Sequence, residues 1–107
     1  MAVLEVGALP DGALEAAAAF HAQVLPQALA ELSDPPGAGE DLVLVFPPAP
    51  YDHRGWRLAV VQDLARAAAP ARVNGVAGDD EAAVAAAVAW LAAAPGVTGQ
   101  LLAVEPG

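Results

Sequence analysis

The chain has 107 residues, enough for one hydrophobic core, so we expect a single domain over residues 1–107 rather than separate cofactor and substrate domains. Its formal net charge of −9, with four arginines and no lysine, disfavours general binding to nucleic acid phosphates or to an anionic membrane. The sequence has no cysteine, which excludes disulfides and thiolate chemistry, and no basic leader or long apolar run. We therefore expect a soluble, cytoplasmic protein.

The N-terminal segment predicts a strand followed by a long helix. Ala2 to Val6 is a short apolar run that ends at Gly7, and Asp11 stands where a helix N-cap is expected. The helix predicted over Gly12–Leu32 contains Pro26, so we expect a kink or a restart there. Its predicted apolar stripe consists of Leu14, Phe20, Val24, Leu25 and Leu29.

The middle of the chain repeats this pattern. Residues 33–40, SDPPGAGE, have the composition of a turn, and the apolar run of Asp41–Phe46 is typical of a strand covered on both faces in a parallel sheet. Asp52 can cap a second helix over His53–Ala69, which Pro70 ends. The apolar stripe predicted for this helix consists of Trp56, Val60, Leu64 and Ala67.

The last third predicts two more strands around a third helix. Arg72–Ala77 and Gly99–Val104 read as strands, and Asp79 or Asp80 caps a helix that runs to about Ala94. The order β-α-β-α-β-α-β predicts an α/β fold with a four-stranded parallel sheet, order 1-2-3-4, and three helices. If every crossover is right-handed, all three helices lie on one face of the sheet. The other face then needs a partner, which favours an oligomer.

Two motifs in this last third resemble the C-terminal half of a short-chain dehydrogenase/reductase. They are LARAAAPARVNGVAG, residues 64–78, and AAVAWLAAAPGVTGQLLAVEPG, residues 86–107. The matching residues are Arg72, Val73, Asn74, Val76, Thr98, Gly99, Gln100 and Val104. The resemblance implies a half-Rossmann domain that corresponds to the family's fourth to seventh strands.

The same resemblance implies that the family's chemistry has been lost. That family uses a tyrosine as the acid, a lysine four residues later and a serine, whereas Pro50 falls at the tyrosine position and Arg54 at the lysine position. Tyr51 is one residue out of place, about 100° away on a helix. The only serine, Ser33, lies elsewhere. We therefore expect no catalytic residues.

Cofactor binding in the family's mode is also not expected. No G-x-G-x-x-G turn occurs, and GAGE at residues 37–40 precedes a strand instead of a helix. Gly78 stands in place of a proline, and the next helix begins almost immediately at Asp79, so the segment that folds over the substrate in that family is deleted. We expect no cofactor.

One polar cluster leaves a ligand site open. Tyr51, Asp52, His53 and Arg54 follow a strand at its carboxyl end, where open α/β sheets usually bind ligands. They predict either a residual small-molecule or anion site, with Arg54 and the helix N-terminus as positive elements, or a capped helix start with solvated side chains. His21 and His53 do not have the spacing of a metal pair, so we expect no metal.

Three consecutive acids, Asp79, Asp80 and Glu81, have two interpretations. They resemble a divalent cation site, but acids in the first turn of a helix are already explained by capping and by the helix macrodipole. Capping is the simpler interpretation.

The leading hypothesis is a non-catalytic domain that acts by association, as a homodimer or as a hetero-oligomer with a complete short-chain dehydrogenase/reductase. In the family it resembles, the helices equivalent to Gly12–Leu32 and His53–Ala69 form one dimer interface, and the last helix and strand form another. The candidate interface residues are Phe20, Trp56, Val60, Trp90 and Leu101. The alternatives are a minimal ligand-binding domain or enzyme that uses Tyr51, His53 and Arg54, and a fragment or designed half-fold.

Overall fold

The computed structural model describes residues 1–33 and 40–105, and in them four parallel strands form one sheet. The strands are β1 (Ala2–Glu5), β2 (Leu42–Phe46), β3 (Val73–Ala77) and β4 (Leu101–Ala103). Their order, β1-β2-β3-β4, and their parallel pairing confirm the predicted sheet. Most of the turn predicted at residues 33–40, including the GAGE segment as far as residue 39, lies outside the described residues.

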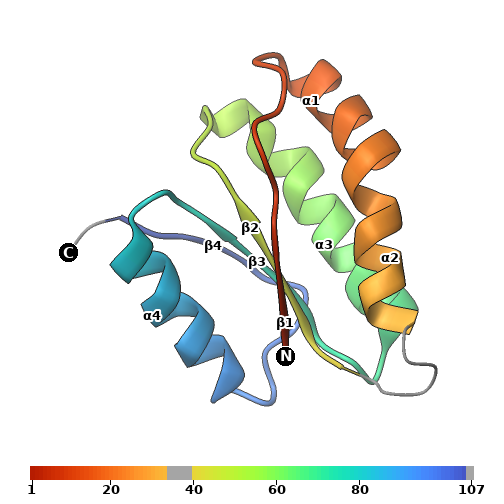
Figure 1. The fold of residues 1–107 in the computed structure, drawn as a ribbon, viewed down its shortest axis with the longest axis vertical. Helices are drawn as coiled ribbons and strands as arrows, with labels where there is room; N and C mark the ends of the chain where they lie inside the picture. The colour runs from red at the N-terminus through yellow and green to blue at the C-terminus, as the bar shows by residue number, and fades with distance from the viewer. Residues whose placement is uncertain (34–39, 106–107) are drawn as a thin grey trace.

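Helical segments connect the strands. The first connection holds α1 (Ala13–Ala19), a π-helical segment η1 (Phe20–Val24) and α2 (Leu25–Ser33), which follow one another as one helical path (Figure 1). The second begins with the 3-10 turn η2 (Tyr51–His53) and continues as α3 (Arg54–Ala68), and the third is α4 (Glu81–Ala92). No helix in the described part of the chain is long and apolar enough to cross a bilayer.

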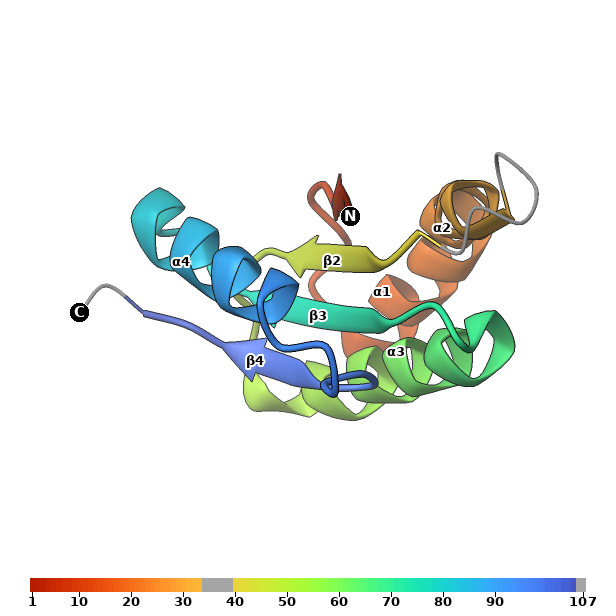
Figure 2. The same ribbon diagram turned by 90° about the horizontal axis from the view of Figure 1, so that it is seen from below.

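The expectation that all helices share one face of the sheet is wrong. Figures 1 and 2 show α1, α2 and α3 on one face and α4 on the other. Because the strands advance in one direction across the sheet, a helix on the opposite face gives the third crossover the opposite hand from the first two. At least one crossover is therefore left-handed, contrary to the general rule for parallel strands.

The alternation of side chains along β2 explains why both faces need cover. Leu42, Leu44 and Phe46 pack with α1–α3 in the larger core, while Val43 and Val45 belong to a second core with Val76 and Leu91. In a strand, successive side chains point to opposite faces, so an unbroken apolar run requires an apolar layer on each side. α4 supplies part of that second layer.

The first helix changes its register before the proline. The N–H of Leu25 donates to the carbonyl of Phe20, a five-residue step typical of a π-helix, and Pro26 follows at once without an N–H. The predicted apolar stripe is therefore only partly right. Phe20 and Val24 are buried, but Leu14 is 85% exposed, and the small Ala16 and Ala28 are buried instead.

The helix caps correct two further predictions. Asp80 is the N-cap of α4, and its Oδ2 accepts the N–H of Ala83 at 2.9 Å, as one of the two predicted candidates. Gly12 is the N-cap of α1 and has no side-chain cap bond, so the prediction of Asp11 is wrong. Asp52 lies within η2 and does not cap α3.

Of the stripe predicted for α3, Val60 and Leu64 are buried, whereas Ala67 is exposed.

Candidate functional site

The predicted polar cluster lies at the carboxyl end of β2, but its side chains do not converge. Tyr51 is 86% exposed, and Asp52 and Arg54 are also exposed. His53 turns inward and is only 4% exposed. The cluster is therefore split between one buried imidazole and three solvated side chains.

His53 joins two loops at this end of the sheet. Its Nε2 donates to the carbonyl oxygen of Asp11 at 2.8 Å, because its Nδ1 accepts the indole N–H of Trp56 at 3.3 Å and so carries no proton. Asp11 precedes α1 and Trp56 belongs to α3, so the imidazole fixes the start of one helix against the other. Both ring nitrogens are used, which makes His53 a positioning group within the fold.

Arg57 is the functional candidate that the sequence reasoning missed. It lies on the buried face of α3, one turn before Val60 and Val61, and is 4% exposed. One guanidinium nitrogen donates to the carbonyl of Pro47 at 2.9 Å, and the guanidinium carbon lies 4.9 Å from the centre of the Phe46 ring. The sequence feature that could have indicated it is a charged residue at a position in phase with the apolar stripe of α3.

A small cavity connects Arg57 with part of the predicted cluster. Its volume is about 140 Å³, and it opens between the start of α3 and the ends of β3 and β4. The wall is formed by Ala49, Pro50, Tyr51, His53, Arg54, Arg57, Ala77, Leu101 and Ala103. Two guanidinium groups at the carboxyl end of a parallel sheet can bind an anionic group, but nothing in this wall resembles an acid, base and nucleophile set.

The RVN motif has a structural role that is visible in its contacts. The Arg72 guanidinium pairs with the Asp41 carboxylate at 2.9 Å and also donates to the carbonyls of Leu91, Ala94 and Val97. One side chain therefore ties the start of β2 to the end of α4. Carbonyls at a helix C-terminus lack partners within the helix, and a cation there is favourable.

Asn74 ties the TGQ motif to the sheet. Its side-chain amide donates to the Val97 carbonyl at 3.0 Å and accepts the N–H of Gln100 at 3.0 Å. Thr98 Oγ1 accepts the N–H of Val73, and Gly99 has a φ of +72°, a conformation that favours glycine. The two motifs thus hold β4 in register against β3.

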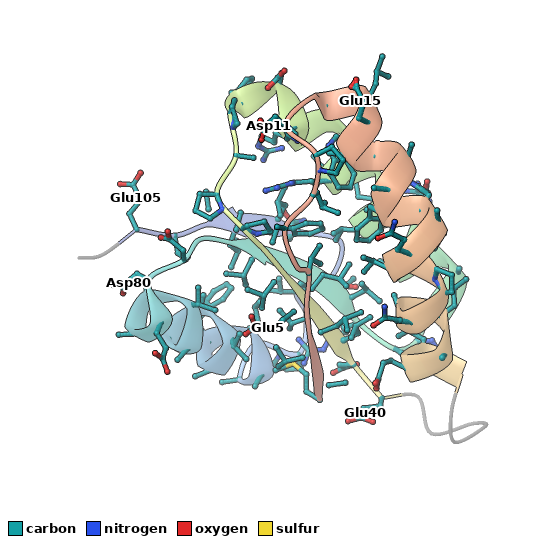
Figure 3. The ribbon with its side chains drawn as sticks, turned by 45° about the horizontal axis from the view of Figure 1, so that its top comes forward. Glu5, Asp11, Glu15, Glu40, Asp80 and Glu105 are labelled. Atoms are coloured by element: carbon teal, nitrogen blue, oxygen red, sulfur yellow. The ribbon has the colours of Figure 1, made fainter. Side chains whose placement is uncertain are left out.

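A larger groove lies on the α4 face of the sheet. It has a volume of about 630 Å³ and runs between β1, β2 and α4. Its wall is formed by Val3, Glu5, Val45, Gly78, Asp79, Glu81, Val84, Ala85, Val88, Ala89 and Ala92. The wall is mostly apolar, and Figure 3 shows Glu5 pointing from β1 toward α4. α4 therefore covers only part of this face.

The five candidate interface residues differ in their access to a partner. Phe20 and Val60 are buried within the single chain, Trp56 and Leu101 are half-buried, and Trp90 is 55% exposed. Trp90 is therefore not a core residue of this chain. Whether any of these residues meets a partner stays a prediction.

No group of three or more side chains of the metal-binding types converges in the described residues. His21 is exposed, and its Nδ1 lies 2.7 Å from the carbonyl of Ala17 within the first helix. Of the three acids at the start of α4, Asp80 is engaged as the N-cap.

The open parallel sheet, with helices on both faces and an Asn-anchored loop before the last strand, defines the chain as an α/β domain. The family model of short chain dehydrogenase-like proteins (SDR-like) matches residues 4–104. The chain therefore belongs to the short chain dehydrogenase-like family. No curated protein and no solved structure shows a significant match to it.

Proposed function

We propose that this chain is a non-catalytic member of its family that acts by association with another chain. The partner is a complete short-chain dehydrogenase/reductase or a second copy of this chain. The residues at the family's reactive positions support the non-catalytic role. The incompletely covered sheet supports the association with another chain.

The carboxyl end of β2 does not carry the groups needed to reduce a carbonyl. Pro50 and Arg54 stand where the resemblance places the tyrosine and the lysine. Tyr51, the only tyrosine in the sequence, is 86% exposed and lies one residue away from the position of the acid, and the sequence has no lysine. The planar guanidinium of Arg54 cannot reproduce a lysine amine that contacts both the tyrosine and the ribose.

The observation that carries the proposal is the open edge of β1 beside the groove. In the described residues β1 pairs only with β2. The N–H of Ala2 donates to the carbonyl of Asp41, just before β2, and the N–H of Val6 donates to that of Val45 in β2. The alternation of a parallel ladder therefore turns the N–H groups of Val3 and Glu5 to the open side. Val3 is 47% exposed at the rim of the groove. An open strand edge beside an apolar groove is a surface that another strand can extend.

Charge on the groove distinguishes the two partners. Glu5, Asp79 and Glu81 all line it, so two copies of this chain would place like charges together, and a partner with basic residues would not. Added salt should therefore strengthen association of the chain with itself and weaken association with a basic partner, because salt screens repulsion and attraction alike.

The experiment is a measurement of particle mass by light scattering, for the chain alone and mixed with a complete short-chain reductase from the same genome. The test variant is Val3→Pro, which removes an N–H from the open edge but none from the β1–β2 ladder. The matched control is Val3→Thr, which keeps that N–H. We expect the native chain and Val3→Thr to form complexes and Val3→Pro to remain a monomer.

Two outcomes count against the proposal. A native chain that stays monomeric at all concentrations and salt levels, alone and with the reductase, overturns the association. Saturable binding of a nicotinamide dinucleotide in calorimetry, together with turnover of a carbonyl substrate, overturns the non-catalytic assignment.

A further inference from the structure

The arginines of this chain divide into two groups. Arg66 pairs with Asp63, and Arg72 pairs with Asp41. Arg54 and Arg57 have no carboxylate partner among the residues that the structure describes, although acids outnumber bases by 13 to 4 in the sequence. The two unpaired cations line the same cavity.

Arg57 is the more unusual of the two because it is buried. Its guanidinium carbon lies 4.9 Å from the centre of the Phe46 ring and 5.7 Å from that of Trp56, and its Nε has no hydrogen-bond acceptor. Desolvation by burial lowers the pKa of Arg57 from its ordinary value. A buried cation is costly without a counter-charge, and the ring contacts and the Pro47 carbonyl supply only partial compensation.

The cavity beside Arg57 is suited to such a counter-charge. No carboxylate lines it, and Tyr51, His53 and Arg54 form the rest of its polar wall. Asp11 lines a second pocket with His53 and Arg57, but it forms no ion pair with either arginine. Since one water occupies about 30 Å³ of liquid, the volume of about 140 Å³ admits one small charged group rather than a whole cofactor.

We propose that this cavity binds the oxyanion group of a small metabolite, a carboxylate or a phosphate. Arg57 is the buried cation of the site, because its planar fork of N–H donors matches two oxygens of such a group. The exposed Arg54 supplies a second positive charge from the solvent side, and Tyr51 lies where the remainder of the ligand would leave the cavity. The site does not depend on the association proposed above.

The test is the shift of the thermal unfolding midpoint on adding sodium phosphate or sodium acetate, against sodium chloride at equal ionic strength. A ligand that binds only the folded state raises the midpoint in a saturable way. We expect such a rise with at least one of the two oxyanions. A response to phosphate alone, or to acetate alone, supports the site and names the chemistry of its ligand.

Two variants and one control locate the effect. Arg57→Met and Arg54→Gln should each weaken binding by about tenfold or more, since hydrogen bonds to charged groups are the strong ones. Arg66→Met, on the same helix but paired with Asp63, should bind as the native chain does. Arg57→Met removes an uncompensated buried charge and should fold, and Arg54→Gln alters an exposed side chain, so at least one variant remains measurable.

The proposal is overturned if phosphate and acetate shift the midpoint no more than chloride does. It is equally overturned if folded Arg57→Met and Arg54→Gln keep the native response. A monomeric chain that still shows the arginine-dependent shift would reject the association and retain this site.

Discussion

At the scale of single residues, burial decides what each arginine contributes. The Arg66–Asp63 pair has side chains that are 70% exposed, whereas Arg72 and Asp41 are 14% and 27% exposed and share further hydrogen bonds. Exposed pairs are screened by water and cost side-chain entropy, so they contribute little. A pair that is withdrawn from water and fully bonded costs much more to break.

The first prediction is that Arg72→Met lowers the free energy of unfolding by about 2 to 3 kcal/mol. The substitution leaves the Asp41 carboxylate without its cationic partner and removes the hydrogen bonds that the guanidinium donates to the carbonyls of Leu91 and Ala94. The control Arg66→Met should change the free energy of unfolding by less than about 0.5 kcal/mol. Urea denaturation followed by circular dichroism measures both. Equal effects of the two variants would refute the scaffold role given to Arg72.

Sequence reasoning predicted single residues unevenly. It singled out Asn74, Thr98 and Gly99 through the family motifs, and their contacts in the structure are structural ones. Arg57 was missed because position 57 is in phase with the apolar stripe of α3, where a hydrophobic core residue is ordinarily expected and not a charged one. Only the three-dimensional contacts reveal that it is both buried and unpaired.

At the scale of elements, the strands were easier to predict than the ends of the helices. An unbroken apolar run such as Leu42–Phe46 has one good solution, a strand buried on both faces. Several residues near a helix start can accept a backbone N–H, and which of them does so depends on the entry path of the chain. The N-caps predicted at Asp11 and Asp52 are therefore wrong, and the N-cap predicted at Asp80 is confirmed.

The capping assignment gives the second prediction, on α4. Asp80→Ala should lower the free energy of unfolding by about 1 kcal/mol, since it removes the acceptor for the N–H of Ala83. Asp79→Ala removes an equal charge one residue earlier, from an exposed position, and should have less than half that effect. Thermal unfolding of both variants checks this. A larger loss with Asp79→Ala would mean that the cap is misassigned.

The first helix shows why its apolar stripe could be predicted only in part. A stripe read at 3.6 residues per turn loses its phase where a π-helical segment inserts a residue, as it does over Phe20–Val24. Pro26 predicted an irregularity in the helix, but it did not indicate that a π-helical segment would form before the proline. Leu14 lies on solvent for a different reason, because six residues at about 100° each turn it well away from the buried face of Phe20.

At the scale of the whole molecule, strand order was predictable but the side on which α4 packs was not. Sequential strands usually lie side by side, which gives the order β1-β2-β3-β4. The hand of each crossover has a strong general preference, and the departure here arises from packing, because Val43, Val45 and Val76 need apolar cover on the α4 face. Only the assembled sheet shows how much of that face stays open.

The open edge of β1 can be tested directly by amide hydrogen exchange at Val3 and Glu5, measured by NMR as a function of the concentration of the chain or of its partner. We expect fast exchange at both amides in the free chain and strong protection in the complex, with Val6 protected in both states because it already donates to Val45. Exchange at Val3 and Glu5 that stays fast in a complex of more than one chain would contradict it, because association would then use another surface.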